Sequence, residues 1–589
     1  MLQRKRADER IARERVLFKR HCGGDIAACV IYPNTYPLAM ANLGFQAIYR
    51  IFDAAPQVAA DRAFLPDRED RQEMEGRGEM LLSFEQGRAL SDFDILAFSI
   101  SFETDYLNLL SILDLAGIPA SGKQRRDRNY PLIIAGGSAI FLNPEPIADF
   151  VDLFLIGEGE EMVPEFLAAY AAARSAGASR QRMLSALSRL PGAYNPDLYD
   201  PHYDEMGHLS GVIYHGEGLP RVKRRLVKDL NRFQTNSLIL TEESVFGDMY
   251  LVEASRGCQW GCRFCAAGFM YRPIRYRKPE TLIPQALEGL KERNVIGLVG
   301  AEMASVPGVA EIARSVTDAG GRLSPSSLKA DCISPGLASA LAQGGNRSVT
   351  IAPEAGSERM RKVINKNLTE PEILRAASMM AGEGVENLKL YFMIGLPEET
   401  DADVEAIALL AARILDRARA GKSRIGRLTV SLNPFVPKPW TPFQWDPMED
   451  AKSNKRKISL LRSMLGRMGG VELDAESPRE AYFQTLVSRG DRRVGAILER
   501  LHRERREEPG DIWQSLREIS REAMRSNPGP LVDPDFFVYR AYKHEELLPW
   551  DFIDHNVHKW FLLSERRKAH FEHQTKPCDV LRCTVCGAC

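Results

Sequence analysis

Three cysteines near the middle of the chain have a spacing that suits metal chemistry. In the stretch GCQWGCRFCAAGF, Cys258, Cys262 and Cys265 form a CxxxCxxC pattern directly after a run typical of a strand. Three thiolates on one short loop can bind three corners of a cubane iron–sulfur cluster, and the missing fourth thiolate leaves one iron open to an exogenous ligand. A structural zinc site needs four protein ligands, and no other cysteine or histidine lies close in sequence. We therefore predict an iron–sulfur cluster with an open iron.

A second group of cysteines closes the sequence in CDVLRCTVCGAC. Cys578, Cys583, Cys586 and Cys589 follow a CxxxxCxxCxxC pattern. Four thiolates this close can enclose a zinc ion or bind a second cubane cluster. Free or redox-active thiols are a third interpretation. The repeated two-residue spacing and the redox chemistry predicted upstream favour the second iron–sulfur cluster over zinc.

The other cysteines and two nearby histidines are predicted to have structural roles. Cys22, Cys29 and Cys332 stand apart from both groups, and we expect them to be small buried side chains rather than parts of a disulfide framework. His555 and His558 lie close in sequence to the second group. Packing is favoured for them over metal ligation or acid–base chemistry.

The first cysteine group lies at the start of a regular alternation of strands and helices. Six strands are predicted, at 249–255, 295–300, 323–331, 348–354, 388–397 and 427–435, separated by segments that mostly have a helical pattern. This pattern predicts a partial (βα)6 TIM-like barrel over 246–446. Chemistry in parallel barrels lies at the carboxyl ends of the strands, where the polar residues of these segments fall.

An earlier alternating block predicts a doubly wound, Rossmann-like domain over 26–175. Its strands are expected at 26–33, 94–101, 131–137 and 150–161, with a helix over 38–52. Ligands of such sheets lie at the carboxyl ends of the strands. The candidate binding residues there are Asn34, Thr35, Tyr36, Ser99, Ser101, Gly136, Gly137, Gly157 and Glu158.

The remaining segments are assigned from charge and composition. Residues 1–25 are expected to form a charged helix, 176–245 a bridge between domains, 447–570 a mostly helical C-terminal domain and 571–589 the cysteine-rich tail. The fold class is therefore α/β with a helical C-terminal region. The basic stretches at 4–20 and 221–232 are interpreted as solvated faces, with a polyanion-binding surface as the alternative.

Length and composition exclude several classes of protein. A chain of 589 residues is too long for one ordinary core, and 44% hydrophobic with 27% charged residues is typical of a globular protein. The formal net charge of -1 gives no global attraction to nucleic acid. No apolar run approaches the roughly 18 residues of a membrane helix. We expect a cytoplasmic protein with no membrane partner.

With Phe264 directly before Cys265, the cysteine loop resembles that of the radical SAM superfamily, and the resemblance extends over the predicted barrel, roughly 240–445. In that superfamily the loop binds a [4Fe-4S] cluster, and S-adenosylmethionine binds the open iron. The resemblance implies a set of S-adenosylmethionine contacts at matching strand ends. They are Phe264 beside the cluster, Glu302 for the amino group, Ser326 and Lys329 for the carboxylate or ribose, Glu354 and Ser357 for the ribose, and Met393, Ile394 and Gly395 for adenine.

The doubly wound domain in turn resembles the cobalamin-binding domain of cobalamin-dependent radical SAM enzymes. The resemblance implies that the nine candidate residues of that domain contact cobalamin. One departure is that the common DxHxxG signature is absent and that residues 23–201 contain no histidine. Any cobalamin bound there would have no histidine of this domain on cobalt.

Together these resemblances imply an enzyme that cleaves S-adenosylmethionine to a 5'-deoxyadenosyl radical. A cobalamin-dependent C-methyltransferase acting on an sp3 carbon is the favoured function. The alternative is a cobalamin-free radical SAM enzyme that modifies RNA or a peptide and uses the first domain to recognise substrate. An electron donor such as flavodoxin or ferredoxin is the implied partner, and the substrate is not identified by these residues.

Overall fold

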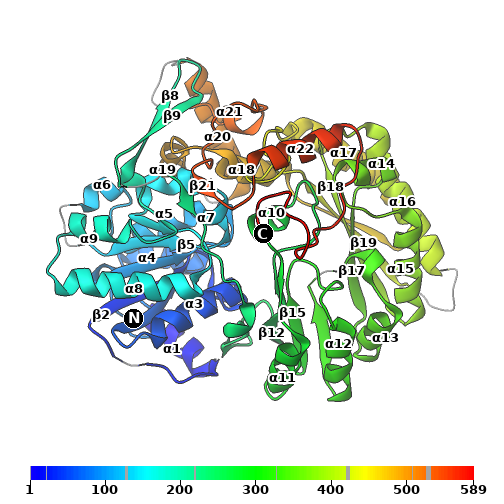
Figure 1. Ribbon diagram of the computed structural model, residues 1–589, viewed down its shortest axis with the longest axis horizontal. Helices are drawn as coiled ribbons and strands as arrows, with labels where there is room; N and C mark the ends of the chain where they lie inside the picture. The colour runs from blue at the N-terminus through cyan, green and yellow to red at the C-terminus, as the bar shows by residue number, and fades with distance from the viewer. Residues whose placement is uncertain are drawn as a thin grey trace.

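A computed structural model describes residues 2–21, 23–126, 130–217, 220–326, 328–419, 425–506, 508–525 and 532–589. Two α/β units lie side by side, and the chain returns to the space between them at its C-terminal end (Figure 1). None of the helices in the described ranges is long and apolar enough to cross a membrane.

The first unit is built on a six-stranded sheet of order β3-β2-β4-β5-β6-β7. All pairs are parallel except the last, in which β7 runs antiparallel to β6. The order reverses between β2 and β4, the kind of point at which open α/β sheets bind ligands. The predicted doubly wound domain is therefore confirmed. Its strands are β2 (Ile26–Tyr32), β3 (Val58–Phe64), β4 (Ile95–Ser99), β5 (Leu132–Gly136), β6 (Leu153–Leu155) and β7 (Ala193–Tyr194).

The edge strand β3 is absent from the sequence prediction because charged residues occupy its middle. Asp61 and Arg62 have no exposed surface. Arg62 is compensated by Glu14, at 2.7 Å, and by Glu85, at 2.6 Å. Buried charges persist where they are paired in this way. A strand with such a centre does not have the apolar pattern by which strands are recognised.

Helices cover both faces of this sheet. Helix α3 packs with α8 on one face, while α5 packs on the other. The Asn42 side chain caps α3 by accepting the Phe45 N–H at 2.9 Å. The helices of the first unit are α1 (Leu2–Arg13), α2 (Tyr36–Met40), α3 (Leu43–Ala54), α4 (Arg68–Arg77), α5 (Tyr106–Leu115), α6 (Gly122–Arg125), α7 (Ser138–Leu142), α8 (Gly159–Ser175) and α9 (Arg180–Leu187).

Two strands of the bridging region pair with strands near the two ends of the chain. Strand β10 pairs with β21, and β11 pairs with β1, whereas β8 and β9 form a hairpin of their own. The bounds are β1 (Arg15–Val16), β8 (Tyr199–Tyr203), β9 (Leu209–Tyr214), β10 (Val222–Lys223), β11 (Ile239–Leu240) and β21 (Ile553–Asp554).

The second unit is an open barrel of parallel strands in two sheets. The orders are β12-β15-β16 and β17-β18-β19-β20, and a bridge between Leu328 and Ile351 links the two sheets. The predicted partial barrel is present, and it extends by one strand, β20, into the region expected to be helical. The strands are β12 (Met249–Glu253), β15 (Val295–Val299), β16 (Arg322–Pro325), β17 (Ser348–Glu354), β18 (Asn387–Ile394), β19 (Arg427–Pro434) and β20 (Val471–Ala475).

Amphipathic helices follow the barrel strands and cover the outer face of the barrel. In β18, Leu388, Leu390 and Phe392 are buried in the core that these helices share, so the alternating residues point to the interior of the barrel. The helices are α11 (Pro279–Gly289), α12 (Val309–Asp318), α13 (Pro335–Gln343), α14 (Glu358–Val363), α15 (Glu370–Gly382), α16 (Asp401–Arg419) and α17 (Ala451–Leu465).

The C-terminal helices do not form a separate core. Leu486 and Ile497 belong to the same apolar cluster as Leu109 and Ile112 of the first unit. The C-terminal helices are α18 (Pro478–Arg489), α19 (Val494–Arg503), α20 (Pro509–Arg525), α21 (Asp535–Val538) and α22 (Lys559–His570). In Figure 1, α18 to α21 lie above the sheet of that unit, whereas α22 lies beside α14 of the barrel.

Candidate functional site

The three motif cysteines lie on a loop whose ends are joined by two short antiparallel strands, β13 (Ser255–Arg256) and β14 (Arg275–Tyr276). Gly257 opens this loop with a φ of 89°, and a Cβ there would come to 2.7 Å from the Tyr271 carbonyl oxygen. Only glycine fits such a position. The Cys265 N–H then donates to the Cys262 carbonyl at 3.0 Å, just before α10 (Ala267–Met270). This turn gathers the cysteines at the carboxyl end of β12.

The surroundings of the three thiols favour the neutral form. Burial raises the pKa of Cys258 and Cys265, and it raises the pKa of Cys262 to about 11. The charge of Cys265 adds to the rise in the pKa of both other thiols. Metal ions reverse this preference because they bind thiolates. Three buried thiols that repel one another when ionised therefore fit a group that supplies positive charge, as the predicted cluster would.

A turn after α14 packs against both sides of Cys262, and the sequence analysis did not predict it. The Arg263 N–H donates to the Ile364 carbonyl at 3.0 Å, and Asn365 Nδ2 donates to the Gly261 carbonyl at 3.0 Å. Asn365 is fully buried with a φ of 54°, a conformation that asparagine tolerates better than most residues. The peptide on each side of Cys262 is thereby fixed.

Lys366, the next residue of this turn, brings a buried positive charge to the cysteines. It is 8% exposed, and its Nζ lies 3.2 Å from Glu354 Oε1. Burial lowers the pKa of Lys366, but the negative charges of Glu354, Cys262 and Cys265 outweigh that effect and raise it. The only sequence signal was a lysine between two asparagines directly after a helix.

Glu354 lies where the sequence analysis placed it, at the end of β17 and beside the cysteines. Its φ is 67°, and the register between β17 and β18 shifts at this residue. A positive φ in a non-glycine residue costs free energy, and such strain clusters at functional sites. The Glu354 carboxylate accepts a hydrogen bond from Lys366 Nζ. A contact with ribose stays a prediction.

Glu302 and Ser326 also reach the strand ends, and both have partners within the protein. Glu302 accepts the N–H groups of Ala304, at 2.7 Å, and Lys329, at 3.2 Å. Ser326 Oγ donates to the Gly300 carbonyl at 2.9 Å. These bonds tie the loop after β15 to the loop after β16. The two side chains therefore hold the strand ends together.

Lys329 has partners within the protein, and its contact with S-adenosylmethionine stays a prediction. Its Nζ lies 2.6 Å from both carboxylate oxygens of Asp331 and 3.9 Å from the centroid of a ring of Trp260. With 3% exposure, it is a buried and compensated cation. Ser327, between these two predicted contacts, lies outside the described residues.

Phe264, expected beside the iron–sulfur cluster, and Met393, expected near adenine, pack against the same small apolar cluster. Ile394 is fully buried in the core of the barrel. Phe264 joins the cysteine loop to the end of β18 through this cluster. The structure thus brings these three predicted residues to the same end of the barrel.

Ser357 and Gly395 have local structural roles. Ser357 Oγ caps α14 by accepting the Met360 N–H at 3.0 Å, and it donates to Asp403 Oδ1 at 2.5 Å. Gly395, with a φ of 74°, donates its N–H to Glu399 Oε2 at 2.8 Å. A contact of either residue with S-adenosylmethionine stays a prediction.

A cavity of about 790 Å³ lies between the two units. Asn34, Thr35 and Tyr36 are not among its lining residues. Asn34 lines a separate cavity of about 420 Å³, and the buried Tyr36 hydroxyl donates to Glu14 Oε1 at 2.8 Å. The other six residues predicted for the first domain line the larger cavity: Ser99, Ser101, Gly136, Gly137, Gly157 and Glu158.

The walls of this cavity come from elements that the sequence analysis did not connect. The first wall is the apolar side of α3 with the start of α8, and the opposite wall is the inner face of β12 and β15. The apolar face of the helix at 38–52 could have indicated the first wall, but the sequence analysis looked for binding residues only at the ends of strands. The walls include Leu43, Ala47, Ile48, Ile51, Met162 and Val163 on one side and Met249, Leu251, Gly297 and Val299 on the other.

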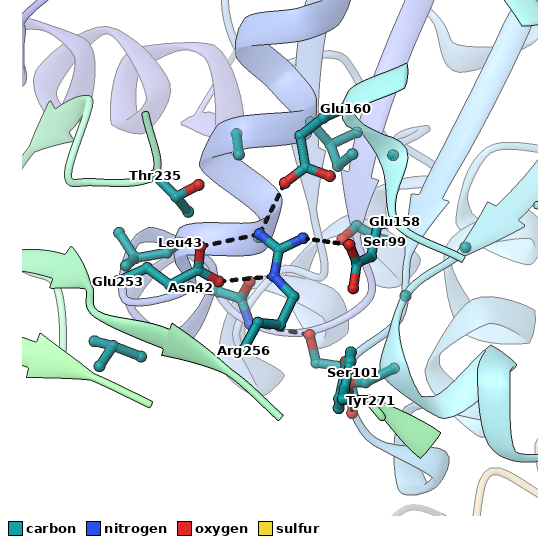
Figure 2. A pocket seen from close by; sticks show the side chains of 18 of the residues that line it. Asn42, Leu43, Ser99, Ser101, Glu158, Glu160, Thr235, Glu253, Arg256 and Tyr271 are labelled. Carbon is teal, nitrogen blue, oxygen red and sulfur yellow. Dashed lines mark hydrogen bonds and ion pairs between the residues drawn. The ribbon is translucent and has the colours of Figure 1, made fainter. Parts of the chain in front are cut away.

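Arg256 crosses the cavity between the two units (Figure 2). Its guanidinium lies 2.8 Å from Glu160 and 3.1 Å from Glu158 of the first unit, and 3.0 Å from Glu253 of the barrel. Arg275, opposite Arg256 in the β13–β14 pair, binds both oxygens of Glu158 at 2.7 Å. The two strands that close the cysteine loop are thus both tied to the first unit through Glu158.

Both carboxylate oxygens of Glu158 have partners within the protein. It is 5% exposed and also accepts the Val227 N–H at 2.8 Å. Burial opposes ionisation, but the bonds from Arg275 and the charge of Arg256 outweigh it and lower the pKa of Glu158. Its carboxylate therefore serves the contact between the units. A role in binding cobalamin stays a prediction.

The neighbouring glycines are explained by backbone packing. A Cβ on Gly157, which has a φ of 134°, would lie 2.4 Å from the backbone nitrogen of Arg225. A Cβ on Gly137 would lie 2.3 Å from the Ile100 carbonyl oxygen. The close approach of Gly137 is thus to the residue that follows β4, and a contact of Gly136 or Gly137 with cobalamin stays a prediction.

The cysteine-rich tail lies directly against the cysteine loop. The Cys578 N–H donates to the Gln259 carbonyl at 2.8 Å. Burial, opposed by the charge of Arg272 and aided by that of Cys586, raises the pKa of Cys578 to about 11. Over the described ranges, no group of three or more His, Cys, Asp or Glu is arranged to hold a single metal ion. The zinc and iron–sulfur interpretations of Cys578, Cys583, Cys586 and Cys589 both stay predictions.

The two histidines near the tail differ in their surroundings. His555 is fully buried, with Nε2 2.8 Å from the Phe141 carbonyl oxygen, as expected for a packing role. His558 donates its N–H to the Cys586 carbonyl at 2.9 Å, and its ring lies against Gly587. It therefore lies beside the tail thiols.

Of the isolated cysteines, Cys29 is fully buried as expected. Cys332 is only half-buried, and its sulfur lies 3.4 Å from Ser305 Oγ. It is thus not the core residue that was expected. Cys22 lies outside the described residues.

The basic stretches are largely compensated within the chain. Arginines of both stretches form ion pairs with acidic residues of neighbouring elements, which fits the interpretation as protein surface rather than as a polyanion site. The pairs include Arg6 with Asp70, Arg10 with Glu243, Arg15 with Glu292, Arg225 with Glu165 and Arg232 with Glu161.

Comparison with known proteins gives matches over both units. The family described as "Radical SAM superfamily" matches residues 252–411, and the family described as "Radical SAM proteins, N-terminal" matches residues 44–196. An uncharacterized protein of Methanocaldococcus jannaschii, MJ0966, is 30% identical over 415 residues, which are 70% of this chain and 81% of that protein.

Two solved structures are similar at low identity. TsrM, a radical S-adenosylmethionine methyltransferase from Kitasatospora setae with cobalamin and a [4Fe-4S] cluster bound, is 13% identical with a TM-score of 0.47, over 81% of this chain and 99% of that one. OxsB, a cobalamin-dependent S-adenosylmethionine radical enzyme with aqua-cobalamin and S-adenosylmethionine bound, is 14% identical with a TM-score of 0.46, over 93% and 79%.

Proposed function

Because this chain belongs to the radical SAM superfamily, we propose that it is a cobalamin-dependent C-methyltransferase. Cys258, Cys262 and Cys265 would hold a [4Fe-4S] cluster, and the cavity between the two units would hold cobalamin. When bound, these groups and S-adenosylmethionine supply a 5'-deoxyadenosyl radical and a methyl group. The observation that carries the proposal is the cavity, which connects the strand ends of the first unit to the start of the cysteine loop.

The lining of this cavity supports cobalamin. Apolar side chains of α3 and α8, among them Ile48 and Val163, suit a flat aromatic base. Ser101 and Arg256 supply polar groups elsewhere in the lining. Among the described residues that line it there is no histidine. Cobalt without a histidine ligand is therefore part of the proposal.

The chain's own residues would position the reacting groups. Glu158 and Arg256 fix the cysteine loop against the cavity, and Phe264 with Met393 offers an apolar surface for adenine. Glu302 and Glu354 are proposed to accept hydrogen bonds from S-adenosylmethionine. Fixed geometry of this kind lowers the entropic cost of bringing reactants together.

Corrinoid content tests the proposal directly. Protein produced anaerobically with cobalamin is expected to contain about one corrinoid per chain. Ile48→Lys, which places a charge among the apolar residues of the lining, is expected to abolish loading. Arg50→Lys on the same helix lies outside the cavity lining and should load normally. Absence of corrinoid from the wild type would overturn the cobalamin assignment and favour substrate recognition by the first unit.

We extend the proposal to a second iron–sulfur cluster on Cys578, Cys583, Cys586 and Cys589. Cys583→Ala is expected to remove about four irons per chain, measured by metal analysis after anaerobic reconstitution. Cys29→Ala, a buried cysteine of the first sheet, is the control and should retain all iron. Unaltered iron together with loss of zinc would identify the tail as a zinc site instead.

The substrate and the electron donor belong to the same proposal. A low-potential one-electron carrier such as flavodoxin or ferredoxin would reduce the cluster. The internal ion pairs of the basic stretches give an RNA substrate no support. The substrate is therefore sought among compounds that gain a methyl group on carbon.

A further inference from the structure

Lys366 has no place in the cysteine motif or in the expected S-adenosylmethionine contacts, yet it lies beside Cys262. Its two predecessors, Ile364 and Asn365, bond to the two neighbours of Cys262 in the loop, each at 3.0 Å. This double attachment fixes the position of Lys366 relative to the cysteine. With 8% exposure, its charge is little screened by water.

A second buried lysine near the cysteine loop, Lys329, is already compensated. Lys329 binds both oxygens of Asp331 at 2.6 Å, whereas Lys366 has a single contact of 3.2 Å with Glu354. Lys366 is therefore less compensated than Lys329, although both are buried.

A cluster bound by three thiolates gains one negative charge when it is reduced. A buried cation next to the ligands stabilises the reduced form, and buried anions destabilise it. Removal of the lysine would also leave Glu354 as an unpaired negative charge beside the cysteines. Both effects shift the reduction potential in the same direction, to more negative values.

We propose that Lys366 sets the reduction potential of the cluster, and that it keeps this potential within reach of the electron donor. The inference rests on the proposed [4Fe-4S] cluster at Cys258, Cys262 and Cys265. The step concerned is the transfer of one electron from a low-potential carrier to the oxidised cluster, with no proton transferred and no bond broken. Lys366 acts on this step through its charge alone.

Potentiometric titration followed by electron paramagnetic resonance tests the proposal. The full-length protein, reconstituted anaerobically without S-adenosylmethionine, is titrated with dithionite in the wild type and in Lys366→Met and Lys366→Arg. Lys366→Met is expected to have a more negative midpoint potential, and Lys366→Arg, which keeps the charge, is expected to match the wild type. The matched control is Lys362→Met, because this side chain is 42% exposed and its charge is screened.

A double variant separates the charge effect from misfolding. Lys366→Met with Glu354→Gln removes both charges of the buried pair, so its potential should return toward that of the wild type. Lys366→Met with full iron content and an unchanged potential would overturn the proposal, as would a shift of equal size in Lys366→Arg. A wild type that binds no cluster would instead refute the proposed function, which keeps the two failures apart.

Discussion

Replacing Cys262 by alanine is expected to abolish the cleavage of S-adenosylmethionine to 5'-deoxyadenosine. Cys262 is the most enclosed of the loop cysteines, and the peptides on both sides of it are fixed by hydrogen bonds. Two remaining thiolates cannot hold a cubane cluster in the way that three do. Product formation is measured by chromatography after anaerobic reconstitution and reduction with dithionite.

Cys332→Ala is the matched control for this experiment, because Cys332 lies outside the motif and contacts Asp331, whose partner Lys329 lies over Trp260 of the loop. It should retain both its iron and its activity. Cleavage at the wild-type rate by Cys262→Ala, in protein shown to be folded, would rule out the radical assignment for this loop.

Replacing Glu158 by alanine is expected to destabilise the protein by about 3–5 kcal/mol, the cost of leaving buried charges uncompensated. Glu158 binds Arg275 through two bonds of 2.7 Å and lies 3.1 Å from Arg256. Its loss leaves both arginines without that counter-charge between the units. Thermal unfolding of the apoprotein, followed by circular dichroism, measures the effect.

The pH dependence of this effect has a definite sign. The pKa of Glu158 is lowered by its arginine partners despite burial, so the stabilisation is complete above the ordinary pKa of glutamate and is lost as the pH falls through the folded-state value. Glu165→Ala, on the same helix, removes an exposed pair with Arg225 and should cost about 1 kcal/mol or less. Equal effects of the two substitutions would show that Glu158 is not a special contact.

The cysteine loop could be predicted because its chemistry is local. Cys258, Cys262 and Cys265 are separated by few residues, and one turn brings them together. The cation beside them could not be predicted in this way. Strand-end reasoning pointed to Lys329, but the structure pairs Lys329 with Asp331 and brings Lys366 to the loop through a turn about a hundred residues downstream.

The fold shows a similar division. Strands with continuous apolar runs, such as β2, were recognised, whereas β3 was missed because Arg62 and Asp61 are buried in it with partners distant in sequence. A ligand site was predicted from the ends of strands, yet part of the apolar cavity wall comes from α3. Which face of a helix meets a ligand depends on tertiary packing, which periodicity alone does not specify.

The ion pairs at Glu158 limit which first units can be combined with which barrels, whether in evolution or in engineered hybrids. The barrel carries Arg256 and Arg275, and both pair with Glu158 of the other unit, although Arg256 also pairs with Glu253 of the barrel. A barrel expressed alone would expose these cations where a cavity wall should be, and a foreign first unit would fit only with an acidic residue at the same place. The two units are therefore interdependent parts, so recombination between relatives should succeed at this boundary only when both sides of the ion pair are inherited together.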